Sequence, residues 1–258
     1  MFYLCYTGGN MLLKAFRMVG GCPAACKGDG SAVLKNILCS LFCCLLGYAI
    51  GNFSPAFLLG KAKGYDIREE GSKNVGATNA FILMGKNAFF LTALLDILKA
   101  FAAYKLCRVL FPSFSPAAAL GGASCVVGHI YPLLLRFRGG KGLASIGGVI
   151  LAWNWKWFFL FLALAIVIAF GTRYVCLVAP TVSLAFPAVY YWSTGLLIST
   201  LILLLPAVPV FAKHWANFVR IREGTEMRTS FIWNKESELK RIGKWNPKTR
   251  SQLDRRGK

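Results

Sequence analysis

Residues 128–142 read Gly-His-Ile-Tyr-Pro-Leu-Leu-Leu-Arg-Phe-Arg-Gly-Gly-Lys-Gly and join an apolar segment to a short loop of cations and glycines. Glycines leave backbone N–H groups uncovered, and Arg136, Arg138 and Lys141 add positive charge beside those donors. If a helix begins near Gly142, the positive end of its dipole points at the same place. The loop therefore predicts an oxyanion site, with phosphate as the favoured ligand. A simple positive-inside turn at a membrane surface is the alternative.

The composition indicates a membrane protein. Of the 258 residues, 56% are hydrophobic and only 16% are charged, whereas soluble domains carry about 25% charged residues. The net charge of +20 would also suit a nucleic-acid-binding protein. However, most cations lie between or after apolar segments, as anchors beside an anionic bilayer do. We therefore expect membrane lipids as partners and no nucleic acid.

The apolar segments predict an all-α, polytopic bundle of about seven transmembrane helices. The expected spans are at about residues 34–59, 88–110, 117–135, 142–154, 157–171, 174–192 and 195–212. Ser54-Pro55 should bend the first span near its inner end. The fourth span is shorter than the roughly 20 residues that cross hydrocarbon, so we expect it to be tilted or re-entrant. Tryptophans around Lys156 mark the interface that separates it from the fifth.

The distribution of cations predicts the orientation. With the C-terminus inside, nine cations lie in inner loops and three in outer loops (Lys61, Lys63, Arg68, Lys73, Lys86, Arg136, Arg138, Lys141 and Arg173 against Lys105, Arg108 and Lys156). The positive-inside rule then places the N-terminus outside and the C-terminus inside. The 60–87 loop, the glycine-lysine loop and the start of the C-terminal tail would all meet at the cytoplasmic face.

The two ends of the chain differ from the membrane domain, which we assign to residues 33–228. Residues 1–32 contain no signal-peptide cleavage pattern, and we expect a poorly ordered extension there. Residues 229–258 carry nine Lys and Arg against three acids, which predicts a basic cytoplasmic tail that associates with anionic lipid and lies outside any active site. No metal is expected, because Cys22 and Cys26 lack a second ligand pair.

Polar residues gather in the first loop. Ser72, Asn74 and Thr78 supply hydroxyl and carboxamide groups, and Gly71 and Gly76 lie between them. Such a mixture suits a small molecule rich in oxygen, although a solvated loop is the alternative.

Charged and titratable residues also occur at apolar segments. Asp96 and Lys99 are three residues apart within a span, so they share a helix face and can pair. The only two histidines, His129 and His214, each lie at a membrane boundary beside a basic stretch, and Asn217 shares the helix face of His214. Each histidine could be a structural hydrogen-bonding group, but two at one surface favour a functional role.

Four spaced motifs resemble those of the PlsY family over about residues 40–228. They are Gly-Ser-x-Asn-x-Gly-Ala-Thr-Asn at 71–79, Asp-x-x-Lys at 96–99, Gly-His-x-Tyr-Pro with Gly-Gly-Lys-Gly at 128–142, and His-x-x-Asn with Gly-Thr-Glu at 214–226. The family consists of bacterial membrane glycerol-3-phosphate acyltransferases that use acyl-phosphate. The resemblance implies a seven-helix enzyme of phospholipid biosynthesis in the bacterial plasma membrane, with its active site at the cytoplasmic face and no cofactor.

The resemblance also implies site residues. The catalytic residues would be Lys141, His214 and Asn217. Substrate and phosphate binding would fall to Ser72, Asn74, Gly76, Thr78, Asn79, His129, Arg138, Gly139, Gly140 and Gly142. Supporting roles would fall to Arg68, Asp96, Lys99 and Glu226.

Some positions depart from the family pattern. Ile82 stands where the family usually has an arginine, Cys176 and Ala179 where it has serines, and Arg138 where it has a lysine. These departures remove one cation and two hydroxyls from the implied site. A catalytically weak relative is therefore an alternative.

The implied reaction moves a fatty acyl group from acyl-phosphate to the sn-1 hydroxyl of glycerol-3-phosphate, giving lysophosphatidate and inorganic phosphate. Because the phosphate leaving group is a weak base, the site mainly needs cations and backbone donors that hold two phosphates together. Either His214 or a substrate phosphate would accept the hydroxyl proton. A transporter for a phosphorylated solute is the rival function, because charges inside a span would suit it too.

Overall fold

The computed structural model describes residues 30–243, and every regular element in that range is helical. The α-helices are α2 (Gly30–Gly51), α3 (Pro55–Ala62), α4 (Ala77–Met84), α5 (Lys86–Leu110), α6 (Ala117–Ile130), α7 (Leu143–Trp153), α8 (Trp155–Thr172), α9 (Val178–Thr194), α10 (Leu197–Leu204), α11 (Ala207–Arg222) and α12 (Lys235–Arg241). Three short 3₁₀ turns join them, η1 (Leu133–Leu135), η2 (Val175–Leu177) and η3 (Thr229–Ile232). Most of the expected N-terminal extension, with Cys22 and Cys26, and the last part of the expected tail lie outside the described residues.

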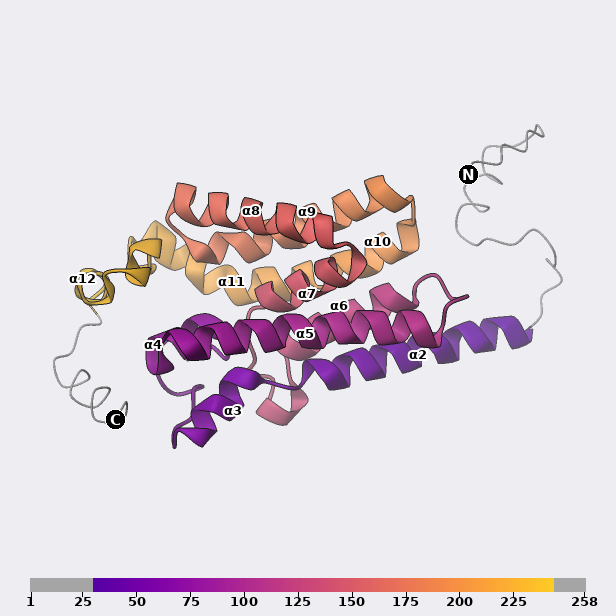
Figure 1. Cartoon of the computed structure of the whole chain (residues 1–258), viewed down its shortest axis with the longest axis horizontal. Coiled ribbons are helices and arrows are strands. Elements are labelled where there is room, and N and C mark those ends of the chain that lie inside the picture. Colours follow the sequence, from indigo (N-terminus) through magenta and orange to yellow (C-terminus); the bar gives the residue numbers. More distant parts are fainter. Residues whose placement is uncertain (1–29, 244–258) are drawn as a thin grey trace.

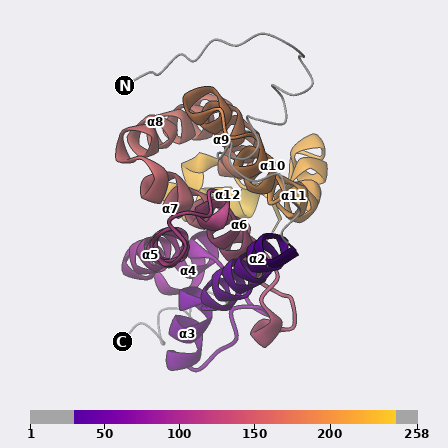
Figure 2. The ribbon, with the colours of Figure 1, turned by 90° about the vertical axis from the view of Figure 1, so that its right-hand side faces the viewer.

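Helices α6 and α7 lie in the middle of the bundle. Helix α6 contacts α2, α5, α10 and α11, while α7 contacts α5, α8 and α9. Figure 2 shows α8 to α11 on one side of this central pair and α2, α3 and α5 on the other. The short helices α3, α4 and α12 gather at one end of the bundle (Figure 1). The polar segments of the chain therefore meet at that end.

The described helices agree with a membrane-embedded chain. Five helical stretches are long and apolar enough to cross a membrane, namely Gly30–Ala62, Ala117–Leu135, Trp155–Thr172, Val175–Thr194 and Leu197–Arg222. Helix α5 has 25 residues, which is ample length, but it carries charged residues that lower its apolar character. Helix α7 has 11 residues and is short for a full crossing, as its sequence predicts.

Three predicted breaks are confirmed, and two predictions need correction. The chain breaks between α2 and α3 before Pro55, α7 begins directly after Gly142, and Asn154 separates α7 from α8. The expected 60–87 loop, however, contains helix α4, whose Ala80 packs with neighbouring apolar side chains. The polar and glycine residues before α4 make the whole stretch resemble a loop, so the sequence does not reveal this short helix. The last span also extends past the expected residue 212, because α11 continues as a helix to Arg222.

Glycines permit very close packing of α2 on α6. A methyl group on Gly47 would collide with the backbone carbonyl of Gly121, and one on Gly51 with the carbonyl of Cys125. Small residues four apart on one helix face allow two backbones to approach in this way, which matters in a bilayer where the hydrophobic effect does not drive helices together. In the same way, Gly148 of α7 lies against the carbonyl of Ile97 in α5.

This packing predicts that Gly47→Ala destabilises the protein. The added methyl group must push two helix backbones apart, and overpacking of this kind costs about 1–3 kcal/mol. Thermal unfolding in detergent measures the effect. Gly171→Ala in α8 is the matched control, because a methyl group there meets no atom within 4 Å. Equal unfolding temperatures for the two variants would contradict the proposed role of the close approach.

Candidate functional site

Lys141 lies just before α7 and reaches across to α11. Its Nζ donates a hydrogen bond to Oδ1 of Asn217 at 2.6 Å, and Nδ2 of Asn217 donates to Oε1 of Glu226 at 2.7 Å. The second carboxylate oxygen of Glu226 accepts from Nε of Arg220 at 2.6 Å. We call these four residues the Lys141 network. They connect the glycine-lysine loop to the end of the last long helix.

The Lys141 network carries an excess of positive charge. It contains two cations, Lys141 and Arg220, and one carboxylate, Glu226, which leaves one positive charge. Asn217 and Glu226 are buried, and burial lowers the pKa of Lys141 while the charge of Glu226 raises it. Burying an ammonium group away from water costs free energy unless an anion pairs with it, so this position suits a phosphate or carboxylate ligand.

The glycines of the loop are required by its contacts with His129. The N–H of Gly140 donates to the carbonyl of His129 at 3.0 Å. A methyl group on Gly139 would collide with that carbonyl, and one on Gly140 would collide with Nε2 of the imidazole. Gly142 has a φ of +89° and caps the N-terminus of α7, so the helix dipole points toward the loop as predicted. These contacts fix the loop, and Lys141 lies in it between two glycines.

A buried cluster of Asp96, Lys99 and His129 lies behind the loop. Oδ1 of Asp96 is 2.7 Å from Nζ of Lys99 and 3.2 Å from Nδ1 of His129. Lys99 also donates to the carbonyl of Phe53 at 2.6 Å, in the break between α2 and α3. The predicted pairing of Asp96 with Lys99 is confirmed. Since Nδ1 of His129 is within the cluster and Nε2 is against Gly140, we infer that this histidine supports the loop.

Asn79 organises the first polar loop from within. Its side chain is completely buried, accepts from the N–H of Ser72 at 2.8 Å, and donates to the carbonyls of Ile67 and Glu70. All of these partners are backbone groups of the loop, so we infer that Asn79 positions the loop. Ser72 and Thr78 are exposed, and Asn74 is partly exposed.

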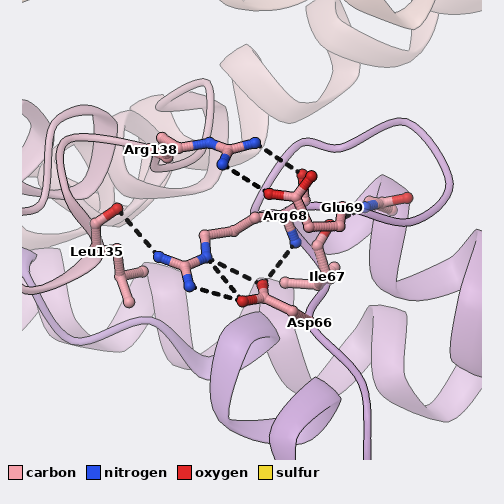
Figure 3. Close-up of polar contacts among 7 residues, drawn as sticks. Asp66, Ile67, Arg68, Glu69, Leu135 and Arg138 are labelled. Carbon is pink, nitrogen blue, oxygen red and sulfur yellow. Dashed lines mark hydrogen bonds and ion pairs between the residues drawn. The ribbon is translucent and has the colours of Figure 1, made fainter.

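Two arginines tie the first loop to the glycine-lysine loop (Figure 3). Arg68 pairs with Asp66 at 2.6 Å and donates to the carbonyl of Leu135 at 3.4 Å. Arg138 pairs with Glu69 at 2.7 Å and donates to the carbonyl of Arg68 at 3.1 Å. The hydrogen bonds from Arg68 lower the pKa of Asp66 to about 2. Arg138 is implied as a phosphate ligand, but its guanidinium is engaged by this bridge.

The structure thus joins Lys141 to Glu226 through Asn217. It places His129 against Gly139 and Gly140, and Asp96 and Lys99 contact His129 from behind the loop. Within the described residues, no hydrogen bond joins Ser72, Asn74 or Thr78 to the Lys141 network, and Gly76 caps α4.

Two cations near the site were missed by sequence reasoning. Arg220 is three residues after Asn217, and that helical spacing could have revealed it. Lys213 has its Nζ 4.9 Å from the ring centroid of Tyr131 in a partly buried position.

The fold and the site define a helical membrane protein with a cationic loop framed by glycines. A family model described as glycerol-3-phosphate acyltransferase matches residues 41–224. A glycerol-3-phosphate acyltransferase of Symbiobacterium thermophilum is 36% identical over 184 residues, covering 71% of this chain and 92% of the relative. One of Bordetella pertussis is 37% identical over 202 residues, covering 75% and 93%.

Solved structures agree with this match. The crystal structure of PlsY, an integral membrane glycerol 3-phosphate acyltransferase, in its glycerol 3-phosphate form has 28% sequence identity and a TM-score of 0.69, covering 75% of this chain and 96% of that chain. The lysophosphatidic acid form has a TM-score of 0.67 at 28% identity, covering 73% and 94%. The chain therefore belongs to the PlsY-type glycerol-3-phosphate acyltransferase family, which confirms the resemblance of the four motifs.

The buried cluster yields a prediction on stability. Asp96→Ala leaves the Lys99 ammonium buried without its carboxylate, and breaking a buried pair from one side costs about 3–5 kcal/mol. The double variant Asp96→Ala/Lys99→Met removes both charges and should recover part of that loss. Thermal unfolding of the wild type, both single variants and the double variant in one detergent measures the coupling. Additive losses would show that the pair does not act as a unit.

Proposed function

We propose that this chain transfers a fatty acyl group from acyl-phosphate to the sn-1 hydroxyl of glycerol-3-phosphate, giving lysophosphatidate and inorganic phosphate. This would be the first acylation of phospholipid biosynthesis. The observation that carries the proposal is the Lys141 ammonium, held by Asn217 among three glycines with one excess positive charge around it. Family membership supports the same reaction class.

In this proposal, Lys141 and the loop N–H groups other than that of Gly140, which donates to His129, bind phosphate oxygens and hold the two substrates together. The oxygen of the sn-1 hydroxyl attacks the acyl carbon, its new ester bond forms, and the bond between that carbon and the phosphate oxygen breaks. Phosphate leaves with the bonding electrons. The cations offset repulsion between two anionic substrates, and proximity supplies much of the acceleration. Ser72, Asn74 and Thr78 remain proposed substrate contacts from the neighbouring loop.

His214 is the proposed acceptor of the hydroxyl proton. Its Nδ1 is 2.7 Å from the carbonyl oxygen of Val210. A carbonyl can only accept, so Nδ1 carries the proton of a neutral ring and Nε2 is left as an acceptor. The ring is close enough to Lys141 and Glu226 to interact with both charges. A base beside the phosphate clamp would therefore be available without a metal or cofactor.

Seven spans are proposed from the helix inventory. Adding α5 and α7 to the five long apolar stretches gives seven, in the order expected from the sequence. We propose that the N-terminus is outside, that the C-terminus and the site are at the cytoplasmic face, and that the membrane is the bacterial plasma membrane. The gathering of α3, α4 and α12 at one end of the bundle supports a single polar face (Figure 1).

One of the departures from the family pattern, Cys176, lies close to the proposed site. The Cys176 thiol interacts with the Glu226 carboxylate and is close to Lys141, so its sulfur occupies the surroundings of the Lys141 network. Ala179, three residues later at the start of α9, is buried. The catalytically weak alternative rests on these two positions and on Ile82.

The sharpest test of the reaction is Lys141→Ala. Purified protein should release phosphate from palmitoyl-phosphate in a manner that depends on glycerol-3-phosphate. The variant should lose roughly a hundredfold or more in acyl transfer, because a charge-assisted contact to a desolvated phosphate is worth several kcal/mol and each 1.36 kcal/mol is tenfold in rate.

Lys86→Ala is the matched control, because Lys86 is exposed and begins α5 outside the four motifs. It should cost little. Near-normal release by both variants would reduce the loop to a positive-inside anchor. Equal losses in both would point to general surface charge, and absence of transfer in the wild type would favour the weak relative.

The orientation predicts the labelling of an engineered cysteine at position 73. A thiol reagent that cannot cross membranes should reach Lys73→Cys only from the cytoplasmic side, because the exposed first loop lies on the cation-rich face. The experiment uses right-side-out and inverted vesicles, with the protein lacking the new cysteine as background. Labelling from outside would overturn both the topology and the shared cytoplasmic site.

A further inference from the structure

Residues 228–243 pack against the bundle beyond the part of the chain that the family model matches. They comprise η3, α12 and their flanks, and we call them the C-terminal clasp. Phe231 is buried, with its ring centroid 5.3 Å from that of Phe81, and the Trp233 ring is stacked on Phe170 at 6.0 Å. The N–H of Thr229 donates to the carbonyl of Arg173 at 2.8 Å. This differs from the expected basic tail, whose assigned start at residue 229 falls inside a packed segment.

The clasp is organised around Glu238. This buried carboxylate accepts from the N–H of Arg228 at 2.8 Å, from the Ser230 hydroxyl at 3.0 Å and from Arg241 at 2.6 Å. Burial raises the pKa of Glu238, but these hydrogen bonds outweigh it and hold the pKa below the usual range. Glu238 is therefore ionised at neutral pH and forms a compensated ion pair with Arg241 inside the clasp, as one unit.

Arg241 connects this unit to the backbone of the Lys141 network. While its Nε and Nη2 bind Glu238, its Nη1 donates to the carbonyl of Gly224 and its Nη2 donates to the carbonyl of Glu226. These two carbonyls belong to the turn that follows α11. Because the Glu226 side chain holds both Asn217 and Arg220, fixing its backbone also fixes the orientation of the carboxylate.

We propose that the C-terminal clasp positions Glu226, and through Asn217 the Lys141 ammonium, with Arg241 as a further positioning residue for the reaction. A guanidinium can bind one carboxylate and two carbonyls at once because its donors form a rigid fork, and lysine lacks that geometry. The proposal rests on the proposed function for its activity readout. Its structural part, the fixing of residues 214–226, is independent of the reaction.

The test compares Arg241→Ala, Arg241→Lys and the control Lys240→Ala in the full chain. Lys240 is one residue away on the same helix, where its exposed side chain pairs with Glu236 at 3.1 Å. Arg241→Ala should lower kcat/KM for glycerol-3-phosphate by about ten- to a hundredfold in folded, monodisperse protein, since small displacements of catalytic groups have effects of that size. Arg241→Lys should retain part of the activity, and Lys240→Ala nearly all.

Hydrogen–deuterium exchange of residues 214–226 supplies a readout that does not depend on acyl transfer. Exchange of the turn at 223–226 should be faster in Arg241→Ala and unchanged in Lys240→Ala. If the wild type shows no transfer but the exchange pattern holds, the proposed reaction fails while the positioning by the clasp stands. Unchanged exchange in Arg241→Ala would overturn the proposed positioning by the clasp. So would a loss of total activity that matches the loss of folded protein, with kcat and KM of the folded protein unchanged.

Discussion

A carboxylate buried inside a membrane-embedded bundle must find its counter-charges within the protein, and Asp96 imposes this requirement on several elements at once. Its partners are Lys99 on the same helix and His129 on α6. Lys99 in turn occupies the carbonyl of Phe53, which the break after α2 leaves without a helical partner. The partners of one buried charge therefore connect α5 with α6 and with the break after α2. His129 in turn contacts the glycines beside Lys141.

Charges at the Lys141 network are also compensated within the protein, but here positive charge is in excess. Glu226 is the single carboxylate beside two cations, and its two oxygens accept from Asn217 and Arg220. This arrangement keeps Lys141 oriented through a neutral amide while leaving one positive charge uncompensated. An amide between the two charged groups holds the ammonium in place without neutralising it, which is what a site for an anionic ligand requires.

The sequence predicted the features that local chemistry determines. Charge content and apolar runs gave the helical membrane class, Pro55 and Gly142 marked element boundaries, and the spacing of Asp96 and Lys99 gave their pairing. What it could not give were contacts between distant segments. The ion pair of Arg138 with Glu69 and the three backbone partners of Asn79 join residues whose contacts no local pattern predicts. Likewise, the many basic residues after residue 228 predict an exposed tail, and the sequence does not show that Phe231 and Glu238 are buried.

The long sequence separation within the Lys141 network has a consequence for biosynthesis. Lys141 precedes its acceptor Asn217 by 76 residues. A ribosome adds about 5–20 residues per second, so the lysine is made about 4–15 s before the residue that holds it. During that interval helices α7 to α10, which lie between the two residues in the sequence, are synthesised and can insert and pack. The Lys141 network is therefore among the last parts of the molecule to be assembled. A nascent chain halted within α9 or α10 would carry the glycine-lysine loop without Asn217 and Glu226.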